Sequence, residues 1–313
     1  EVYAGDEVPE SGENLLPFAI QMIIFLVDEL GEAAVPYSRA IFQLMKQIYD
    51  FYHHPEALKA ICSIVHITNQ NVVYAVNLVI KELQNSIFIE ENADESNPVE
   101  QSSYQMRLTA INSISLYLSR CDVQQYFHEL MRILLALLEL QQDDENVKEL
   151  DSDLKTDTLE AINSLHIAFP PLMLPFVERL IPIYEAGLNY ISMVRNPEPG
   201  NQIFEDEDEK EVIRLNSVIL EGLKLLLMNE IEELAAPTLQ LALAAIQIAV
   251  DSPTIDKQCM CELIDLLSVM IKLTPDDTKN FISTNEELKQ LIEESKEDED
   301  LNKAINTMMS LIQ

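Results

Sequence analysis

Basic residues are scarce in this chain. Its 313 residues include 20 lysines and arginines against 54 aspartates and glutamates, which gives a formal net charge of −34 at pH 7. A protein that binds nucleic acid or an anionic lipid surface needs a basic patch to meet the phosphates. The charge balance therefore argues against direct nucleic-acid binding and makes a basic protein segment the natural complement of this surface.

Glycine is rare and tryptophan is absent. The chain has six glycines, while 48% of its residues are hydrophobic. This balance allows a large packed core and favours helices over a sheet protein with many glycine turns. No stretch alternates apolar and polar residues between Asn-Gly or Asp-Gly turns, as a β-hairpin would. We therefore expect a folded, helical protein.

Long hydrophobic runs are also missing. The longest, LLPFAIQMIIFLV at 15–27, contains Gln21 and is shorter than the roughly 18 to 20 residues that a transmembrane helix needs. We expect no membrane span. Residues 1–14 are acidic and polar and do not resemble a signal peptide. Because the first residue is Glu rather than Met, we expect a fragment or a processed chain.

The four cysteines lie within apolar helical patterns and lack the spacing of metal ligands. We expect them to be buried and reduced. The chain has no Asn-x-Ser/Thr acceptor for glycosylation. These features favour the cytoplasm and nucleus as the location. The cysteines are Cys62, Cys121, Cys259 and Cys261.

Sequence motifs of catalysis are not found. The chain has no glycine-rich phosphate loop, no GxSxG and no HExxH, so we expect no cofactor, no bound metal and no enzymatic activity. A helical enzyme is the least favoured class. The histidines occur singly or at a turn, and we expect each to be structural: His53, His54, His66, His128 and His166.

Apolar stripes at helical spacing recur along the chain. From Val123, for example, apolar residues follow at i+4, i+7, i+11 and i+15, which is typical of a helix with a wide buried face. The pattern predicts an all-α protein. The predicted helices are 15–30, 35–51, 56–67, 71–87, 102–119, 123–140, 151–168, 171–193, 210–228, 231–250 and 255–273, with a shorter tail beyond them.

Helix pairs that recur about every 40 to 50 residues are typical of an α-solenoid with HEAT-like repeats, in which each pair buries its faces against its neighbours. A compact bundle is the alternative, but so many helices of similar length without a fixed heptad would be unusual in one bundle. We predict antiparallel helix pairs over 15–292. An acidic, polar segment precedes them at 1–14, and an acidic linker with a terminal helix follows at 293–313, where the linker covers 293–300.

Several stretches resemble HEAT repeats of the importin-β (karyopherin-β) family of nuclear transport receptors. In MRLTAINSISLYL, a basic residue is followed three positions later by alanine and then by apolar residues, as in the second helix of such a repeat: Arg107, Ala110, Ile114 and Leu118. Looser echoes lie at 158–165 and 213–218. The proline-led, leucine-rich stretch 170–188 resembles a first helix of the family.

The resemblance implies a receptor for basic protein cargo, with the small GTPase Ran as a further expected partner. Relatives in this family carry an acidic loop inside one repeat, on the surface that holds Ran and cargo. In this chain, acidic loops are predicted near 88–100, 141–153 and 195–209, each between the two helices of a pair.

The densest charge lies at 205–209. A helix start stabilises anions by roughly 0.3 to 1 kcal/mol each, and with a helix from 210 only the last one or two carboxylates would benefit. The others indicate either a solvated loop or a contact with a basic ligand. The candidate protein-binding residues are Glu205, Asp206, Glu207, Asp208 and Glu209, with secondary acidic segments at Asp143, Asp144, Glu145, Glu90 and Glu91.

The sequence thus favours a non-enzymatic, importin-β-like receptor that binds basic cargo through an acidic surface. The alternative is a HEAT-repeat scaffold of another assembly, such as a phosphatase, chromosome, translation or trafficking complex. Such a scaffold would hold its partners through apolar ridges, and its acidic segments would serve solubility. Salt-sensitive binding distinguishes the first function from the second.

Overall fold

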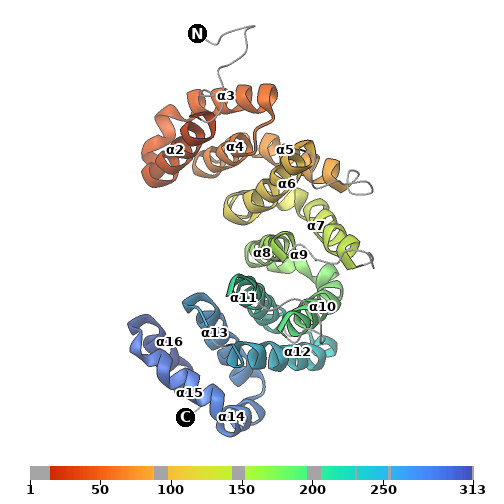
Figure 1. Cartoon of the computed structure of the whole chain (residues 1–313), viewed down its shortest axis with the longest axis vertical. Coiled ribbons are helices and arrows are strands. Elements are labelled where there is room, and N and C mark those ends of the chain that lie inside the picture. Colours follow the sequence, from red (N-terminus) through yellow and green to blue (C-terminus); the bar gives the residue numbers. More distant parts are fainter. Residues whose placement is uncertain are drawn as a thin grey trace. The chain divides into compact units, whose positions relative to one another are not determined.

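The computed structural model describes residues 15–87, 98–142, 152–195, 206–229, 231–252 and 255–311 (Figure 1). Within these ranges the chain forms α-helices and short 3-10 helices, and it contains no β-strand. The prediction of an all-α protein is confirmed for these residues. The chain packs as two units, Glu1–Leu137 and Leu138–Gln313.

The first unit begins with two helices joined by a single 3-10 turn, and α4 packs against both of them. Its elements are α2 (Leu15–Leu30), η1 (Gly31–Ala34), α3 (Val35–Tyr52), α4 (Pro55–Thr68), α5 (Val72–Ile87), α6 (Pro98–Leu116), η3 (Leu118–Arg120), η4 (Gln124–Tyr126) and most of α7 (Phe127–Gln142). Nothing in the sequence pattern marks the boundary between the units, because α7 runs across it as one helix.

Helix α4 packs against α2, α3, α5 and α6. Its start is defined by Pro55 at the first helical position and by the His54 ring, which accepts a hydrogen bond from the Glu56 backbone amide. Its end is defined by Asn69, whose left-handed backbone cannot continue a helix. Every residue from Ala60 to Val65 is buried, so α4 is the core helix of this unit.

Two polar clusters connect distant parts of the first unit. The Asp28 carboxylate of α2 accepts hydrogen bonds from Ser63 of α4, at 2.6 Å, and from Tyr117, at 3.1 Å. The buried Glu82 carboxylate of α5 accepts a hydrogen bond from Tyr49 of α3. A satisfied carboxylate of this kind fixes the relative register of the helices that it joins.

In the second unit, α11 has a central place. The elements are α8 (Ser152–Ala168), α9 (Pro170–Met173), η5 (Leu174–Phe176), α10 (Val177–Arg195), α11 (Asp206–Met228), α12 (Glu232–Val250), α13 (Lys257–Leu273), α14 (Pro275–Thr284), α15 (Glu286–Glu294), η6 (Ser295–Glu297) and α16 (Glu299–Ser310). Helix α11 packs against α8, α10, α12 and α13.

The helices of this unit contact one another in two rows. In one row α8 packs on α11, α11 on α13, and α13 on α16 (Figure 1). In the other, α10 packs on α12 and α12 on α15. Helices α10 and α11, which the sequence predicted as a pair, are in contact, as are α12 and α13. Along the chain, the helices of one row therefore alternate with those of the other: α8, α11, α13 and α16 against α10, α12 and α15.

Gly222 of α11 permits a close approach to Tyr184 of α10. A Cβ atom at Gly222 would lie 2.2 Å from the Tyr184 hydroxyl oxygen and 2.5 Å from its Cζ. Tyr184 is fully buried, so its ring has little room to move away. Glycine costs helix stability at this position, but it is the residue that lets Tyr184 pack here.

Several predicted boundaries are wrong. The single helix expected at 171–193 is α9, η5 and α10: Pro170 and Pro171 start the short α9, and Pro175, which has no backbone N–H, interrupts the helix after it. Helix α11 begins at Asp206 rather than 210. The linker expected at 293–300 instead holds the end of α15, η6 and the start of α16, whose first turn is capped by the Asp298 carboxylate.

One helix in the described part of the chain is long and apolar enough to cross a membrane. It is α12, within the window Glu233–Val250, and 28% of that window is buried in the protein. The core helix of a soluble protein passes the same test. Helix α12 packs against α10, α11, α13 and α15. The absence of a membrane span therefore stays a prediction.

Candidate functional site

A row of charged side chains crosses α8, α11 and α13 in the second unit. On α8, three acids follow at i, i+4 and i+7, which places them on one face of the helix. On α11, charged residues follow at i, i+7 and i+10, and on α13 two acids lie three residues apart. We call this set the carboxylate ladder: Asp153, Asp157 and Glu160 of α8, Arg214, Glu221 and Lys224 of α11, and Glu262 and Asp265 of α13.

Arg214 joins the ladder between α8 and α11. Its guanidinium forms an ion pair with Asp157 and lies 3.0 Å from the Glu160 carboxylate and 3.6 Å from that of Asp153. The planar guanidinium has several donors and can serve more than one carboxylate at a time. One cation here holds three anions of the neighbouring helix.

Lys224 joins the ladder between α11 and α13. Its ammonium donates hydrogen bonds to Glu262, at 2.7 Å, and to Asp265, at 3.3 Å. The Glu262 carboxylate also accepts a hydrogen bond from the Gln258 amide at 2.8 Å. Burial lowers the pKa of Lys224, but its two carboxylate partners outweigh that effect and raise it overall.

Glu221 occupies the middle of the ladder, and an amide holds it in place. The Asn163 side-chain amide of α8 donates to the Glu221 carboxylate at 3.1 Å and to the Val218 carbonyl at 2.9 Å. The Tyr184 hydroxyl donates in turn to the Asn163 side-chain oxygen at 3.2 Å. Because each member is fixed by another, the carboxylate is presented at a defined position.

Negative charge is in excess along the ladder, which has six carboxylates and two cations. Burial raises the pKa of Glu160, and this effect together with the nearby Asp157 outweighs the lowering by the Arg214 guanidinium. Burial also raises the pKa of Glu221, and the Glu262 carboxylate adds to that shift. A raised pKa means that the ionised carboxylate lacks sufficient compensation, so an added cation would stabilise it.

The two ends of the ladder are exposed to solvent, while its middle is largely covered. The side chains of Asp153 and Asp265, at its two ends, are 57% and 61% exposed, and that of Arg214 is 42% exposed. Glu262 and Lys224 are nearly covered. A ligand can therefore reach the outer carboxylates, while the inner groups set the electrostatic potential.

Glu209, one of the predicted binding residues, has a different place. Its carboxylate is 8% exposed and pairs with Arg195 at 2.6 Å. Arg195 also donates to the Ile248 carbonyl at 2.7 Å and to Ser252, so it ties α10 to α11 and α12. This carboxylate already has a cationic partner within the protein and contributes to its fold.

The other predicted residues are less fully described. Asp206, Glu207 and Asp208 lie in the first turn of α11 rather than in the predicted loop at 195–209, a position where the helix dipole stabilises acids. Glu205, Glu90, Glu91, Asp143, Asp144 and Glu145 lie outside the described residues. Ligand binding by these acidic segments stays a prediction.

The ladder was missed because its residues are spread over 113 positions of sequence, from 153 to 265. The helical spacing of Asp153, Asp157 and Glu160 is visible in the sequence and could have indicated an acidic face. What brings α8 to α11 and α11 to α13 is packing between helices that are remote in sequence. The run of acids at 205–209, by contrast, is easily seen in the sequence, but the sequence does not show which of its side chains are buried.

Outside the ladder, the cysteines and one lysine are largely buried. Cys62, Cys121 and Cys259 are buried as expected and Cys261 is half-buried; burial raises the pKa of Cys62 and of Cys259 to about 12. Burial lowers the pKa of Lys155 to about 8. Among the described residues, no three His, Cys, Asp or Glu side chains are placed to hold a metal ion.

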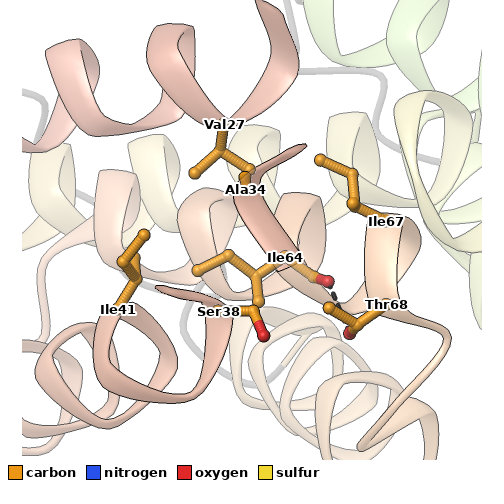
Figure 2. Close-up of a pocket in the computed structure, with 7 residues that line it drawn as sticks. All are labelled: Val27, Ala34, Ser38, Ile41, Ile64, Ile67 and Thr68. Atoms are coloured by element: carbon orange, nitrogen blue, oxygen red, sulfur yellow. Dashed lines mark hydrogen bonds between the residues drawn. The ribbon is translucent and has the colours of Figure 1, made fainter. Parts of the chain in front are cut away.

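The first unit has a small, mostly apolar depression between α2, η1, α3 and α4 that has no room for a water molecule (Figure 2). A groove of 360 Å³ adjoins it and shares the side chains of Ser38, Ile64 and Thr68. The Thr68 hydroxyl donates back to the Ile64 carbonyl at 2.8 Å. The depression holds no cluster of convergent catalytic groups.

No protein-family model, no curated protein and no solved structure matches this chain. The functional proposal therefore rests on the residues and packing of the chain itself.

Proposed function

We propose that the chain is a non-enzymatic protein-binding receptor that holds a basic protein segment against the carboxylate ladder. The observation that carries this proposal is the excess of six carboxylates over two cations on adjoining helices, with raised pKa values at Glu160 and Glu221. Lysine or arginine side chains of a partner would supply the missing positive charge.

The row packing of the second unit supports an α-solenoid architecture with HEAT-like pairs, since each helix buries its faces against the next in its row. Together with the net charge of −34, it supports the proposal of an importin-β-like receptor for basic cargo in the cytoplasm and nucleus. Ran stays an expected partner from the resemblance alone.

The test is a binding titration with a fluorescently labelled, unstructured peptide rich in lysine and arginine. The variant Glu160→Gln/Glu221→Gln removes two charges from the ladder and keeps the side-chain volumes. We expect its Kd to rise by roughly tenfold, because each carboxylate contributes on the order of 0.5 to 1 kcal/mol to such a contact.

A matched control is Glu286→Gln/Glu287→Gln on α15, where both residues are exposed. It changes the net charge by the same amount, away from the ladder. If the control weakens binding as much as the ladder variant, overall charge and not the ladder attracts the peptide. Circular dichroism is used to check that both variants keep their helix content.

A second candidate function is a scaffold that holds partners through apolar contacts. It is favoured by the many large apolar side chains that α2 and α3 expose, including Phe18 at 69% and Phe51 at 86%. Binding that does not weaken with salt would favour this function over the first.

A further inference from the structure

The groove of 360 Å³ in the first unit is lined mainly by polar side chains. They come from α3, from the end of α4 and from the turn that leads into α5. Two apolar residues, Phe42 and Ile64, also line it. The groove adjoins the depression of Figure 2. Its polar residues are Ser38, Arg39, Gln43, Thr68, Gln70 and Asn71.

Arg39 is the one charged side chain among the described residues of this lining. Within the described ranges it makes no hydrogen bond and no ion pair, and the exposed amides of Gln43, Gln70 and Asn71 have no hydrogen-bond partner there either. A guanidinium has five N–H donors, and an amide side chain can both donate and accept. The groove therefore presents a free cation and three free amides to a ligand.

The helices that form the groove lack acidic residues over most of their length. Residues 35–49 of α3 contain no Asp or Glu, and neither does the run 57–81 through α4 and into α5. The chain as a whole has 54 acids in 313 residues. The groove thus lies in a region whose formal charge is opposite in sign to that of the whole chain. The basic residues of these two stretches are Arg39, Lys46, Lys59 and Lys81.

Acidic residues lie further along the chain from the lining. Glu32 lies in η1, seven residues before Arg39. Asp50 lies seven residues after Gln43, and so about 10 Å further along α3. Exposed charges more than about 8 Å apart are largely screened at physiological ionic strength. Arg39, as part of the lining, is therefore the charge that a ligand in the groove meets first.

We propose that this groove binds an acidic, unstructured segment of a partner protein, with one of its carboxylates paired to Arg39. A guanidinium can donate two parallel hydrogen bonds to a carboxylate. The free amides of Gln43, Gln70 and Asn71 match the N–H and C=O groups of an extended peptide backbone. The two apolar lining residues add a contact for its side chains. This binding is independent of the proposed contact between basic segments and the carboxylate ladder.

The test is a methyl NMR titration of the native chain with two unstructured peptides of equal length, one rich in glutamate and one with glutamine at each of those positions. Ile64 lines the groove and gives a methyl signal at the site, whereas Ile305 is buried in α16 and reports remote changes. We expect the glutamate peptide to shift the Ile64 signal and not that of Ile305. The glutamine peptide should bind roughly tenfold more weakly, because it lacks the charge that pairs with Arg39.

Arg39→Gln should raise the Kd of the glutamate peptide by roughly tenfold as well, since it removes the same ion pair. The matched control is Arg132→Gln at an exposed position of α7 in the first unit, outside the groove. It removes the same charge and should leave the Kd unchanged. Circular dichroism first compares the helix content of both variants with that of the native chain.

Three results would overturn the proposal: an Ile64 signal that the glutamate peptide does not shift, equal binding of the two peptides, or equal loss of affinity in the two variants. Free glutamate that binds as tightly as the glutamate peptide would overturn it too, because the groove would then be a site for a small anion and not for a protein segment.

Discussion

Two buried side chains, Glu209 and Lys155, differ in how well a neighbouring group balances their charge. Glu209 is paired with Arg195, which also bonds to α12. Lys155 is 2% exposed, and its ammonium lies over the Tyr190 ring, 5.8 Å from the centroid. A ring face stabilises a cation less than a carboxylate does when both are buried. The first charge therefore supports the fold, and the second costs stability.

Lys155→Met should stabilise the protein at neutral pH. Burial lowers the pKa of Lys155 to about 8 from 10.5, and each pKa unit corresponds to about 1.4 kcal/mol, so the gain near pH 7 is on the order of 3 kcal/mol. Between these two values the unfolded chain holds a proton that the folded chain has lost. The free energy of unfolding therefore rises as pH increases through this window, because the folded protein no longer holds a buried charge at Lys155.

Urea unfolding of the native chain and Lys155→Met, at about pH 7 and about pH 10, measures this effect. The advantage of the variant should shrink at the higher pH. Lys272→Met on exposed α13 surface is the control and should change stability by little at either pH. An equal advantage for Lys155→Met at both pH values would show that the ammonium is not penalised by burial.

Glu209→Gln should destabilise the fold. It leaves the Arg195 guanidinium, which is 13% exposed, without its anionic partner, and breaking a buried ion pair typically costs about 3 to 5 kcal/mol. Glu233→Gln, at an exposed position of α12, is the matched control. Thermal unfolding of the two variants compares them. Equal melting temperatures would mean that Glu209 is not held as the structure describes.

Two helical glycines, Gly222 of α11 and Gly187 of α10, differ in what an added Cβ atom would meet. A Cβ at Gly222 would meet the buried Tyr184 ring, whereas a Cβ at Gly187 would meet the flexible end of Ile219, 2.8 Å away. Alanine in a helix otherwise gains about 1 kcal/mol over glycine. The two helices thus offer the same substitution in two different surroundings.

Gly222→Ala should therefore destabilise the protein by roughly 2 kcal/mol or more, because overpacking outweighs the gain in helix propensity. Gly187→Ala should lie near zero, since the Ile219 methyl can move. Urea unfolding of both variants gives the difference. A Gly222→Ala protein as stable as Gly187→Ala would contradict the close packing of α10 on α11.

Most helices, and the pairing of α10 with α11, were predicted from apolar spacing, while several helix ends and the separate helices after residue 273 were not. Stripes such as 255–273 correspond closely to α13, Lys257–Leu273. Helix α11 starts earlier than expected, because acids at 206–209 suit a helix start as well as a loop. The run 15–27 is apolar on every side of the helix, so the sequence does not separate exposed residues such as Phe18 from buried ones such as Ile20.

For the whole chain, the net charge of −34 predicts how binding depends on salt. Binding of a basic segment to the carboxylate ladder gains from attraction, so it should weaken as salt is raised. Binding of a partner to exposed apolar side chains lacks this attraction, so it should not weaken with salt. These dependences distinguish an electrostatic receptor surface from an apolar one in the same protein.

The carboxylate ladder could be anticipated only in part from composition. The total charge predicts a basic partner, but it does not say which carboxylates lie together. Asp157 and Arg214 are 57 residues apart and form an ion pair because α8 packs on α11. Contacts of this kind follow from tertiary packing, which apolar periodicity does not specify.

The proposed function requires that the carboxylate ladder binds basic protein segments. Calorimetric titration of a lysine- and arginine-rich peptide into the native chain and into Glu160→Gln/Glu221→Gln measures this binding, at ionic strengths from about 0.05 to about 0.5 M. We expect the native Kd to rise steeply with salt and the variant to bind more weakly with a shallower dependence. Equal affinities of the two proteins at every ionic strength would mean that the ladder does not bind the peptide.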